Sequence, residues 1–152
     1  MISRRHLLPL GPALMLAHCA PGPKPPAVLT ITMIGSADQN PSPTGAASPV
    51  AVRLFQLTQT AKFERADVFA LIEREQQTLG QDNAGSQEFV LSPGETLTKT
   101  FELKTGVQAI GVVALYRDID RAQWRAVAPV ATSGPTQLVL NVGKLAIALK
   151  SG

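Results

Sequence analysis

The side chains that most often carry out acid-base or nucleophilic chemistry are scarce in this 152-residue chain, and they lie near its amino terminus. Both histidines, His6 and His18, precede Cys19, which is the only cysteine. If the chain is cut before Cys19, the remaining domain has no imidazole and no internal thiol. A Ser-His-Asp triad, a Cys-His pair, a His-ligated zinc site and an intrachain disulfide are then excluded. Catalysis by carboxylate, lysine or tyrosine side chains remains open.

One pair of carboxylates has a spacing that could serve such chemistry. Asp118 and Asp120 are two residues apart, so in a strand they would share a face. A carboxylate pair can bind calcium or act as acid and base. However, Arg117, Arg121 and Arg125 lie beside them, and a solvated, charged turn explains all five side chains. We therefore expect no catalytic residue, no cofactor and no metal, and hence no enzyme.

Residues 1–18 have the three parts of an export signal. Arg4 and Arg5 give a positive start, residues 7–17 are apolar, and a processing region ends at Cys19. The apolar stretch is too short to span a bilayer, which needs about 20 apolar residues, and its prolines disfavour an ordinary buried helix. A signal that is cut elsewhere, with Cys19 incidental, is the alternative. A twin-arginine motif is also discernible in residues 3–8, so the export route stays open.

Leu16-Ala17-His18-Cys19 resembles a bacterial lipobox, in which the cysteine is lipid-modified and becomes the new amino terminus. The residues that follow, 19–27, are Pro-rich and lack any secondary-structure period, which favours an extended tether between a lipid and a folded domain. By resemblance to lipoprotein sorting rules, Ala20 is not the aspartate that retains lipoproteins in the inner membrane. We therefore expect attachment through acylated Cys19 to the outer membrane, facing the periplasm.

The net charge of +3 mostly reflects the export signal. Without Arg4 and Arg5, 12 Lys and Arg face 11 Asp and Glu, a net charge of +1, and no run of three basic residues follows. The domain therefore lacks the cluster of basic side chains with which proteins bind nucleic acid or an anionic membrane surface.

Apolar residues recur at a spacing of two in much of residues 28–152, which indicates half-buried strands. Leu29, Ile31 and Met33 share one face of such a strand. Residues 109–116 are apolar without alternation, as expected for a central strand that is covered on both faces. The other predicted strands are residues 50–57, 88–91, 97–103, 124–130, 137–142 and 145–149. About eight strands predict a mainly β, two-sheet β-sandwich.

Residues 67–79 break the two-residue period and predict a single helix of about three turns. Asp67 is a possible cap, and Gly80 lies just past the end. We expect this helix to cover an edge or open end of the sandwich, where unpaired strand groups otherwise invite association. The residues near one helical face are Val68, Phe69, Ile72, Gln76 and Leu79.

Large side chains within the predicted strands are assigned to the core rather than to a binding surface. This applies to Phe55, Tyr116 and Trp124. Arg53 alternates with apolar neighbours, so it either faces solvent or pairs with a residue of an adjacent strand.

The segment 36–49 is a long loop between the first two predicted strands. It contains three prolines and one charge, and it has no large apolar residue. Loops of this length in compact domains are usually functional or disordered. Its composition fits a partner contact and a plain solvated linker equally well.

The order and spacing of several short segments resemble the pattern of a known protein family. They are Asn40-Pro41, SPVAVRLFQL at 48–57, Phe63, ADVFAL at 66–71, LSPGE at 91–95, GVVALYRD at 111–118 and Trp124-Arg125. Together they resemble the TssJ family, outer-membrane lipoproteins of the bacterial type VI secretion system. The resemblance implies a transthyretin-like β-sandwich with one added helix.

The resemblance also implies a partner. TssJ proteins hold the periplasmic carboxy-terminal domain of the inner-membrane protein TssM, in part through the loop between the first and second strands. Because the loop residues are small, polar or proline, we expect them to bind the partner while contributing little to folding. The partner-binding residues so predicted are Ser36, Ala37, Asp38, Gln39, Asn40, Pro41, Ser42, Pro43, Thr44 and Gly45.

Three classes of function compete for this chain. The favoured one is a non-enzymatic, lipid-anchored adaptor in an envelope-spanning secretion complex, with no small-molecule substrate. The second is a periplasmic, lipid-anchored ligand-binding module, because fold alone does not decide function. The third is a hydrolase that uses carboxylates only. A deep polar pocket would favour the second class, clustered acids with raised pKa values the third, and a closed core with an exposed loop the first.

Overall fold

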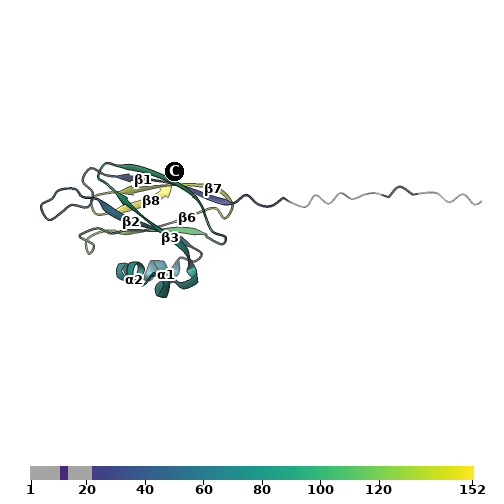
Figure 1. Cartoon of the computed structure of the whole chain (residues 1–152), viewed down its shortest axis with the longest axis horizontal. Helices are drawn as coiled ribbons and strands as arrows, with labels where there is room; N and C mark the ends of the chain where they lie inside the picture. Colours follow the sequence, from purple (N-terminus) through teal and green to yellow (C-terminus); the bar gives the residue numbers. More distant parts are fainter. Residues whose placement is uncertain (1–10, 14–21) are drawn as a thin grey trace, which may run out of the picture.

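In the computed structural model, residues 11–13 and 22–152 are described, and in them eight strands form two packed four-stranded sheets (Figure 1). The strand order is β4-β1-β7-β8 in one sheet and β3-β2-β5-β6 in the other. The strands are β1 Ala27–Gly35, β2 Val50–Leu57, β3 Asn83–Leu91, β4 Thr96–Glu102, β5 Ala109–Ala114, β6 Arg125–Pro129, β7 Gly134–Val142 and β8 Ile147–Ser151. β1 pairs parallel with β7, and the other pairs of strands are antiparallel. The predicted two-sheet β-sandwich is confirmed.

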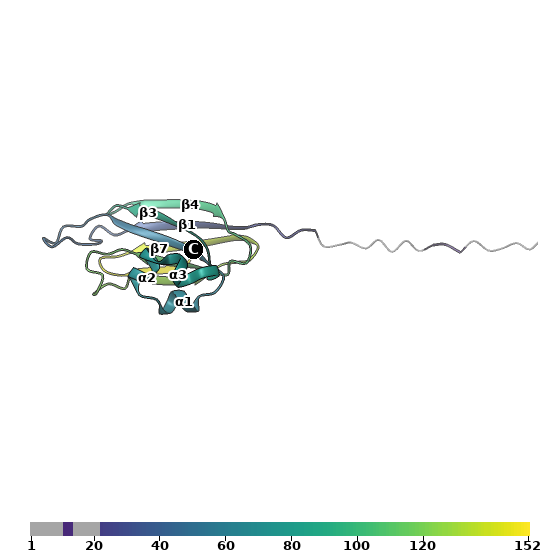
Figure 2. The ribbon, with the colours of Figure 1, turned by 60° about the horizontal axis from the view of Figure 1, so that its bottom comes forward.

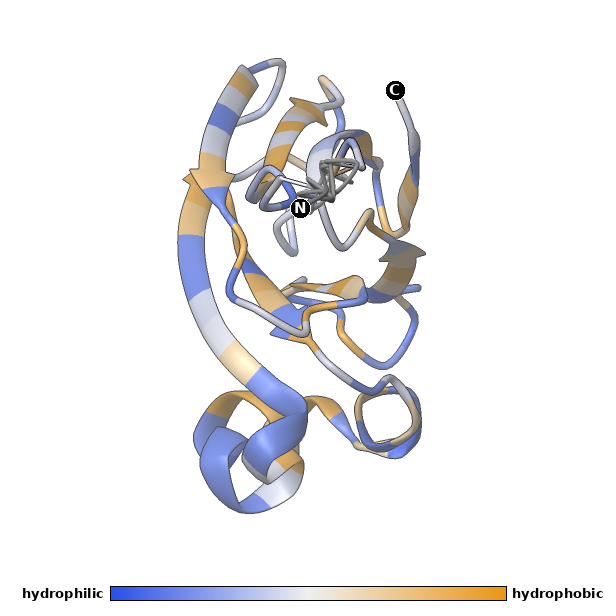
Figure 3. Ribbon diagram, turned by 90° about the vertical axis from the view of Figure 1, so that its right-hand side faces the viewer, coloured by the Kyte–Doolittle hydropathy of each residue, from blue (hydrophilic) through white to orange (hydrophobic). Residues whose placement is uncertain are grey.

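Alternating polarity places the two faces of β1. Leu29, Ile31 and Met33 are fully buried between the sheets. Thr30 and Thr32 lie on the outer face, where their hydroxyls are 3.0 and 3.3 Å from those of the opposite threonines on β4. Figure 3 shows the same alternation of apolar and polar residues along the strands. The predicted alternation of buried and outward-facing residues is therefore confirmed for β1.

β2 and β5 are buried on both faces. Their inner residues join the core between the sheets, whereas Phe55 and Leu57 of β2 and Val113 of β5 belong to a second apolar cluster on the outer face of their sheet. Phe63 completes this cluster, with its ring centroid 5.3 Å from that of Phe55. Gly111 permits this close approach, because a Cβ there would lie 2.7 Å from the Phe63 ring.

The segment between β2 and β3 covers this outer face, and the prediction that it covers an edge or open end is wrong. In the described chain it contains three short α-helices, α1 Ala61–Arg65, α2 Val68–Glu73 and α3 Glu75–Leu79, followed by a 3-10 turn, Gly80–Asp82 (Figures 1 and 2). A face, rather than an edge, needs cover because β2 and β5 carry large apolar residues on both sides.

The single helix predicted over residues 67–79 is broken at Arg74. This residue has φ −129° and ψ 42°, outside the helical region, so α2 ends and α3 begins there. The Thr78 hydroxyl donates to the Ala70 carbonyl (2.9 Å), which also accepts from the Arg74 amide (3.1 Å), so the two short helices are bonded to each other. The predicted cap is present, since the Asp67 carboxylate accepts from the Ala70 amide at 2.8 Å. The break also changes the predicted buried face, because Phe69 and Gln76 are exposed.

Two arginines hold this helical segment against the sheet. The guanidinium of Arg125 donates to the carbonyls of Phe63 and Ala66, both at 2.6 Å, and lies 4.4 Å from the ring of Trp124. Burial lowers the pKa of Arg125 from its usual value. Arg53 donates to the Ile72 carbonyl (3.3 Å) and pairs across the sheet with Glu88 at 2.7 Å. The cross-strand pair is one of the two environments expected for Arg53.

The two ends of the sandwich differ in what they carry. Residues 22–26 leave the domain at one end, and β1 then runs to the opposite end, where the loop 36–49 projects (Figure 1). The three aromatic residues assigned to the core differ in burial. Phe55 and Tyr116 are buried as predicted, with Tyr116 4% exposed, whereas Trp124 is half-buried under Arg125.

The signal cleavage site and Cys19 lie outside the described residues, so both remain predictions.

Candidate functional site

The loop 36–49 begins with a segment that is tied into the domain. The Ser36 amide donates to the Val142 carbonyl (2.9 Å), and the Ser36 carbonyl accepts from Gly94 (3.2 Å). Three residues later the side chain of Gln39 is fully buried. Its amide nitrogen donates to the carbonyls of Leu91 (2.7 Å) and Ser48 (3.3 Å). We call residues 36–40 the base of the loop.

Asn40 is also buried in the base, at 3% exposed, and it bonds to three other segments of the chain. Its side-chain nitrogen donates to the Pro49 carbonyl (2.8 Å), and its side-chain oxygen accepts from the Arg117 amide (2.8 Å). Its own amide donates to the Lys144 carbonyl (3.0 Å). The backbone at Asn40 has φ 45°, a left-handed conformation that asparagine adopts more readily than most residues. Asn40 therefore joins the loop to the β5–β6 connection and to the β7–β8 turn.

The expectation that the loop contributes little to folding does not hold for its base. Gln39 and Asn40 direct their amide groups inward, where they supply hydrogen bonds that backbone groups at this end of the sandwich would otherwise lack. Neither side chain is placed to meet a partner directly. Their burial had no signal in the sequence, because a polar residue in a Pro-rich stretch is ordinarily solvent-exposed.

Residues 41–47 form the tip of the projecting loop, and Ser48 and Pro49 then return beside the base. The Ser42 amide donates to the Ala46 carbonyl (2.7 Å), and the Gly45 amide donates to the Ser42 carbonyl (2.8 Å). Gly45 has φ 86°, which only glycine adopts without strain. Pro43, Thr44 and Gly45 are exposed. The tip is thus a tight turn that presents proline rings and backbone to solvent, and Asp38 is an exposed carboxylate of the base beside it.

The tip lies against the connection between β5 and β6. Pro41, Ser42 and Pro43 line one side of an open cavity of about 410 Å³, and Arg117 and Asp118 line the other. Asp118 and Asp120 are in a turn rather than a strand, and Asp118 lies 3.7 Å from the guanidinium of Arg121. Both members of this pair are substantially exposed, which agrees with the expected solvated, charged turn.

Tyr116 supports the loop base from the core side. Its hydroxyl donates to the Gly143 carbonyl (2.9 Å), one residue before the Lys144 carbonyl that holds Asn40. Burial raises the pKa of Tyr116 to about 12. The phenol is therefore neutral at physiological pH and acts as a hydrogen-bond donor within the fold.

Two kinds of feature are absent from the part of the chain that the structure describes. No three His, Cys, Asp or Glu side chains gather there in a group that could hold a metal ion. No helix in residues 11–13 and 22–152 has the length and apolar character needed to cross a membrane.

Comparison with known proteins relates this architecture to one family. Residues 27–145 match the family described as type VI secretion lipoprotein, VasD, EvfM, TssJ. The T6SS lipoprotein TssJ1 from Pseudomonas aeruginosa is 38% identical, with a TM-score of 0.81 over 84% of this chain and 98% of that one. A structure described as a type VI membrane complex is 25% identical, with a TM-score of 0.73 over 81% of this chain and 97% of that one.

A more distant structure shows a shared fold alone. Lip from Serratia marcescens, described as a membrane-bound component of the type VI secretion system, is 21% identical, with a TM-score of 0.76 over 84% of this chain and 98% of that one. The comparison with curated proteins found no match.

Proposed function

The chain belongs to the type VI secretion lipoprotein family, and we propose that it is a non-enzymatic adaptor in that system's membrane complex. In this proposal it ties the periplasmic carboxy-terminal domain of a TssM-like inner-membrane protein to the outer membrane. The family supports a component of the secretion apparatus, and the match to a type VI membrane complex supports an assembled role. The TssM-like partner comes from the resemblance of the sequence to the TssJ family.

The observation that carries the proposal is the placement of the tether and the loop at opposite ends of the sandwich (Figure 1). With an acylated Cys19 in the outer membrane, residues 22–26 lead into the near end of the domain, and the tip lies at the far end. A partner that rises from the inner membrane would therefore meet the tip first. Two or three acyl chains supply stable anchoring that the domain's surface charge of about +1 could not supply.

The tip is suited to hold a protein partner. Its turn is fixed by internal hydrogen bonds and by the prolines at 41 and 43, so little conformational freedom is lost when a partner docks. The buried base places it rigidly through Gln39 and Asn40. We propose that the contact residues are Pro41 to Gly45 of the tip, together with the exposed Asp38.

A ligand-binding module is the weaker candidate. The space between the two sheets is filled by apolar side chains, many of them with no exposed surface. The cavity beside the tip is open to solvent, and only the tip and the charged turn line it. A projecting loop over a closed core favours a protein contact.

Affinity capture from the cell envelope tests the partner. The full chain with a carboxy-terminal tag is recovered from detergent-solubilised envelopes of the native bacterium, and bound proteins are identified by mass spectrometry. The proposal expects a TssM-like inner-membrane protein among them. Recovery of the chain without that protein, from cells that make it, would contradict the proposal.

Cys19→Ser is the matched control for anchoring. We expect this variant to fold and to bind the same partner domain, but to move from the outer-membrane fraction to the soluble periplasm. If the variant stays in the outer membrane, something other than a lipid on Cys19 anchors the chain. A hydrolytic turnover that disappears in Asp118→Asn would overturn the non-enzymatic assignment.

A further inference from the structure

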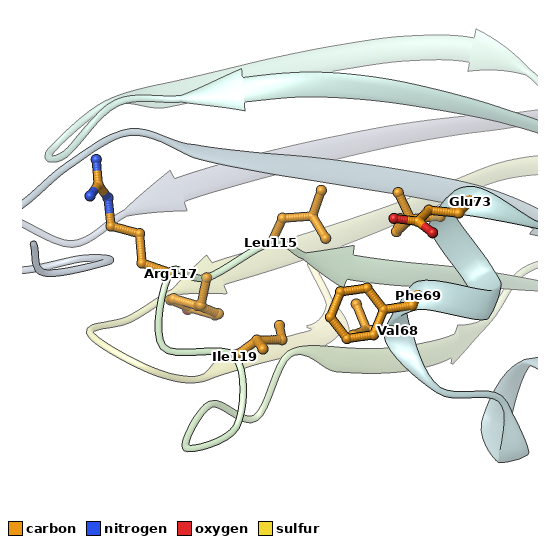
Figure 4. A pocket seen from close by; sticks show the side chains of 8 residues that line it. Val68, Phe69, Glu73, Leu115, Arg117 and Ile119 are labelled. Carbon is orange, nitrogen blue, oxygen red and sulfur yellow. The ribbon is translucent and has the colours of Figure 1, made fainter.

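A second surface beside the loop is shaped for contact. A groove of about 330 Å³ runs between α2 and the segment that follows β5, and its floor and walls are mainly apolar (Figure 4). Phe69 and Ile72 come from α2, and Leu115 and Ile119 come from the segment after β5. The groove thus lies where two segments far apart in the sequence meet. The residues that line it are Val68, Phe69, Ile72, Glu73, Leu115, Tyr116, Arg117 and Ile119.

Phe69 is an unusually exposed apolar side chain in this groove. It is 61% exposed, although the neighbouring Val68 and Leu71 of the same helix are buried. Two other large apolar side chains, Ile34 and Val90, are exposed in the described residues, and neither lines this groove. Single exposed apolar residues are common and need no explanation, but one set within an apolar groove marks a surface that gains by being covered.

Arg117 joins this groove to the loop. This residue lines the groove and also the cavity beside Pro41 and Pro43. Its backbone amide is held by the Asn40 side chain at 2.8 Å, so the position of the arginine depends on the base of the loop. The tip, Arg117 and the groove therefore form one continuous surface.

The charges at the two ends of the groove restrict what can occupy it. Figure 4 shows Arg117 at one end and Glu73 near the other, with Phe69, Leu115 and Ile119 between them. The ion pairs of the described residues involve neither Arg117 nor Glu73, whereas the nearby Asp118 is already paired with Arg121. A complementary segment would carry a carboxylate at the Arg117 end, bulky apolar side chains in the middle and a cationic side chain at the Glu73 end.

We propose that the protein held by the loop tip also seats a segment of this chemistry in the groove. The inference rests on the proposed function, since it assigns a second contact to the same partner. Phe69 is the central anchor of this contact, because aromatic side chains in the middle of an interface contribute a large share of its binding energy. Arg117 lies between the two contacts and bridges them.

Two substitutions of matched exposure test the groove. Phe69→Ser removes the exposed ring, and Val90→Ser removes an equally exposed apolar side chain, 62% exposed, from β3. The full chain in detergent is titrated by calorimetry with the periplasmic carboxy-terminal domain of the TssM-like protein from the same bacterium. We expect Phe69→Ser to weaken binding by about tenfold or more and Val90→Ser to leave it within about twofold.

Arg117→Ala provides a second readout that keeps the backbone amide bonded to Asn40. We expect it to weaken binding several-fold at low salt, and the difference from wild type to shrink as salt rises, because the contact is ionic and exposed. Equal affinities of wild type and Arg117→Ala at every salt concentration would contradict the bridging role.

A chain in which Pro41, Pro43 and Thr44 are each replaced by glycine, the tip variant, separates this inference from the proposed function. If the tip variant loses binding while Phe69→Ser binds like Val90→Ser, the groove proposal is overturned and the proposed function stands. If the TssM-like domain fails to bind even the wild type, both are overturned. If wild type alone sediments as a dimer and Phe69→Ser as a monomer, a second copy occupies the groove and the proposal is wrong.

Discussion

The base and the tip of the same loop are built in opposite ways. In the base, Gln39 and Asn40 are buried and bond to backbone groups of three distant segments of the chain and of the far end of the loop itself. In the tip, Pro43, Thr44 and Gly45 are exposed, and the hydrogen bonds of the turn stay within residues 42–46. Adjacent residues of similar composition therefore differ in their surroundings: the base is bonded into the fold, and the tip is exposed to solvent.

Asn40→Ala should have the largest effect on stability. It removes the donor to Pro49 and the acceptor for Arg117, and it places alanine at φ 45°. Each buried group left without its partner costs about 1–3 kcal/mol, so we expect a loss of roughly 3 kcal/mol in the free energy of unfolding. Urea denaturation followed by circular dichroism measures this loss. A loss under about 1 kcal/mol would mean that the base is no part of the fold.

The stability of the protein at alkaline pH tests the role of Tyr116, which supports the base of the loop through its bond to Gly143. The pKa of Tyr116 is raised to about 12 from an ordinary value of 10, so the folded state holds the proton longer than the unfolded state. Stability from this group is fully present below pH 10 and is lost as the pH rises to 12, by up to about 2–3 kcal/mol.

Tyr116→Phe isolates that contribution. It should be less stable than wild type near pH 7, by about 1 kcal/mol, because the hydroxyl no longer bonds to Gly143. Its stability should fall less steeply between pH 10 and 12, so the difference between the two proteins closes and then reverses in favour of Tyr116→Phe. Parallel stability curves over that range would show that the phenol is not held in its neutral form by the fold.

Gln39→Ala should cost roughly 2 kcal/mol, since the carbonyls of Leu91 and Ser48 lose their donor and a buried side chain is truncated. Thermal unfolding at neutral pH gives the value. Partner affinity should change only as far as the tip is displaced. A variant as stable as wild type would place Gln39 among the surface residues after all.

Thr44→Ala should have the smallest effect. Its hydroxyl contacts only that of Ser42 (2.9 Å), and the residue is exposed. We expect a change within about 0.5 kcal/mol, as for surface substitutions in general. The same thermal unfolding experiment, run beside Gln39→Ala, checks it. A loss as large as that of Gln39→Ala would remove the distinction between tip and base.

Much of the fold could be predicted from local patterns. The strand over residues 50–57 has the predicted bounds, and most others differ by a few residues at their ends. The alternation in β1 and the continuous apolar run of β5 directly report how many faces of each strand are buried. The position of the loop was likewise evident from its prolines and its lack of apolar residues.

What could not be predicted depends on contacts between distant residues. The buried side chain of Gln39 donates to the backbone carbonyl of Leu91. Because Leu91 lies 52 positions away in the sequence, no local pattern reveals this contact. The break at Arg74 and the exposure of Phe69 arise from how α2 and α3 fit over β2 and β5. The groove beside the loop, where α2 meets the segment after β5, was hidden for the same reason.

Paired measurements on the tip variant test the division between base and tip most directly. The substitutions of Pro41, Pro43 and Thr44 leave Gln39 and Asn40 in place. We predict a free energy of unfolding within about 1 kcal/mol of wild type and, by calorimetry, a loss of affinity for the TssM-like periplasmic domain of at least about tenfold. Wild-type affinity in the tip variant, at unchanged stability, would contradict the assignment of partner binding to the tip.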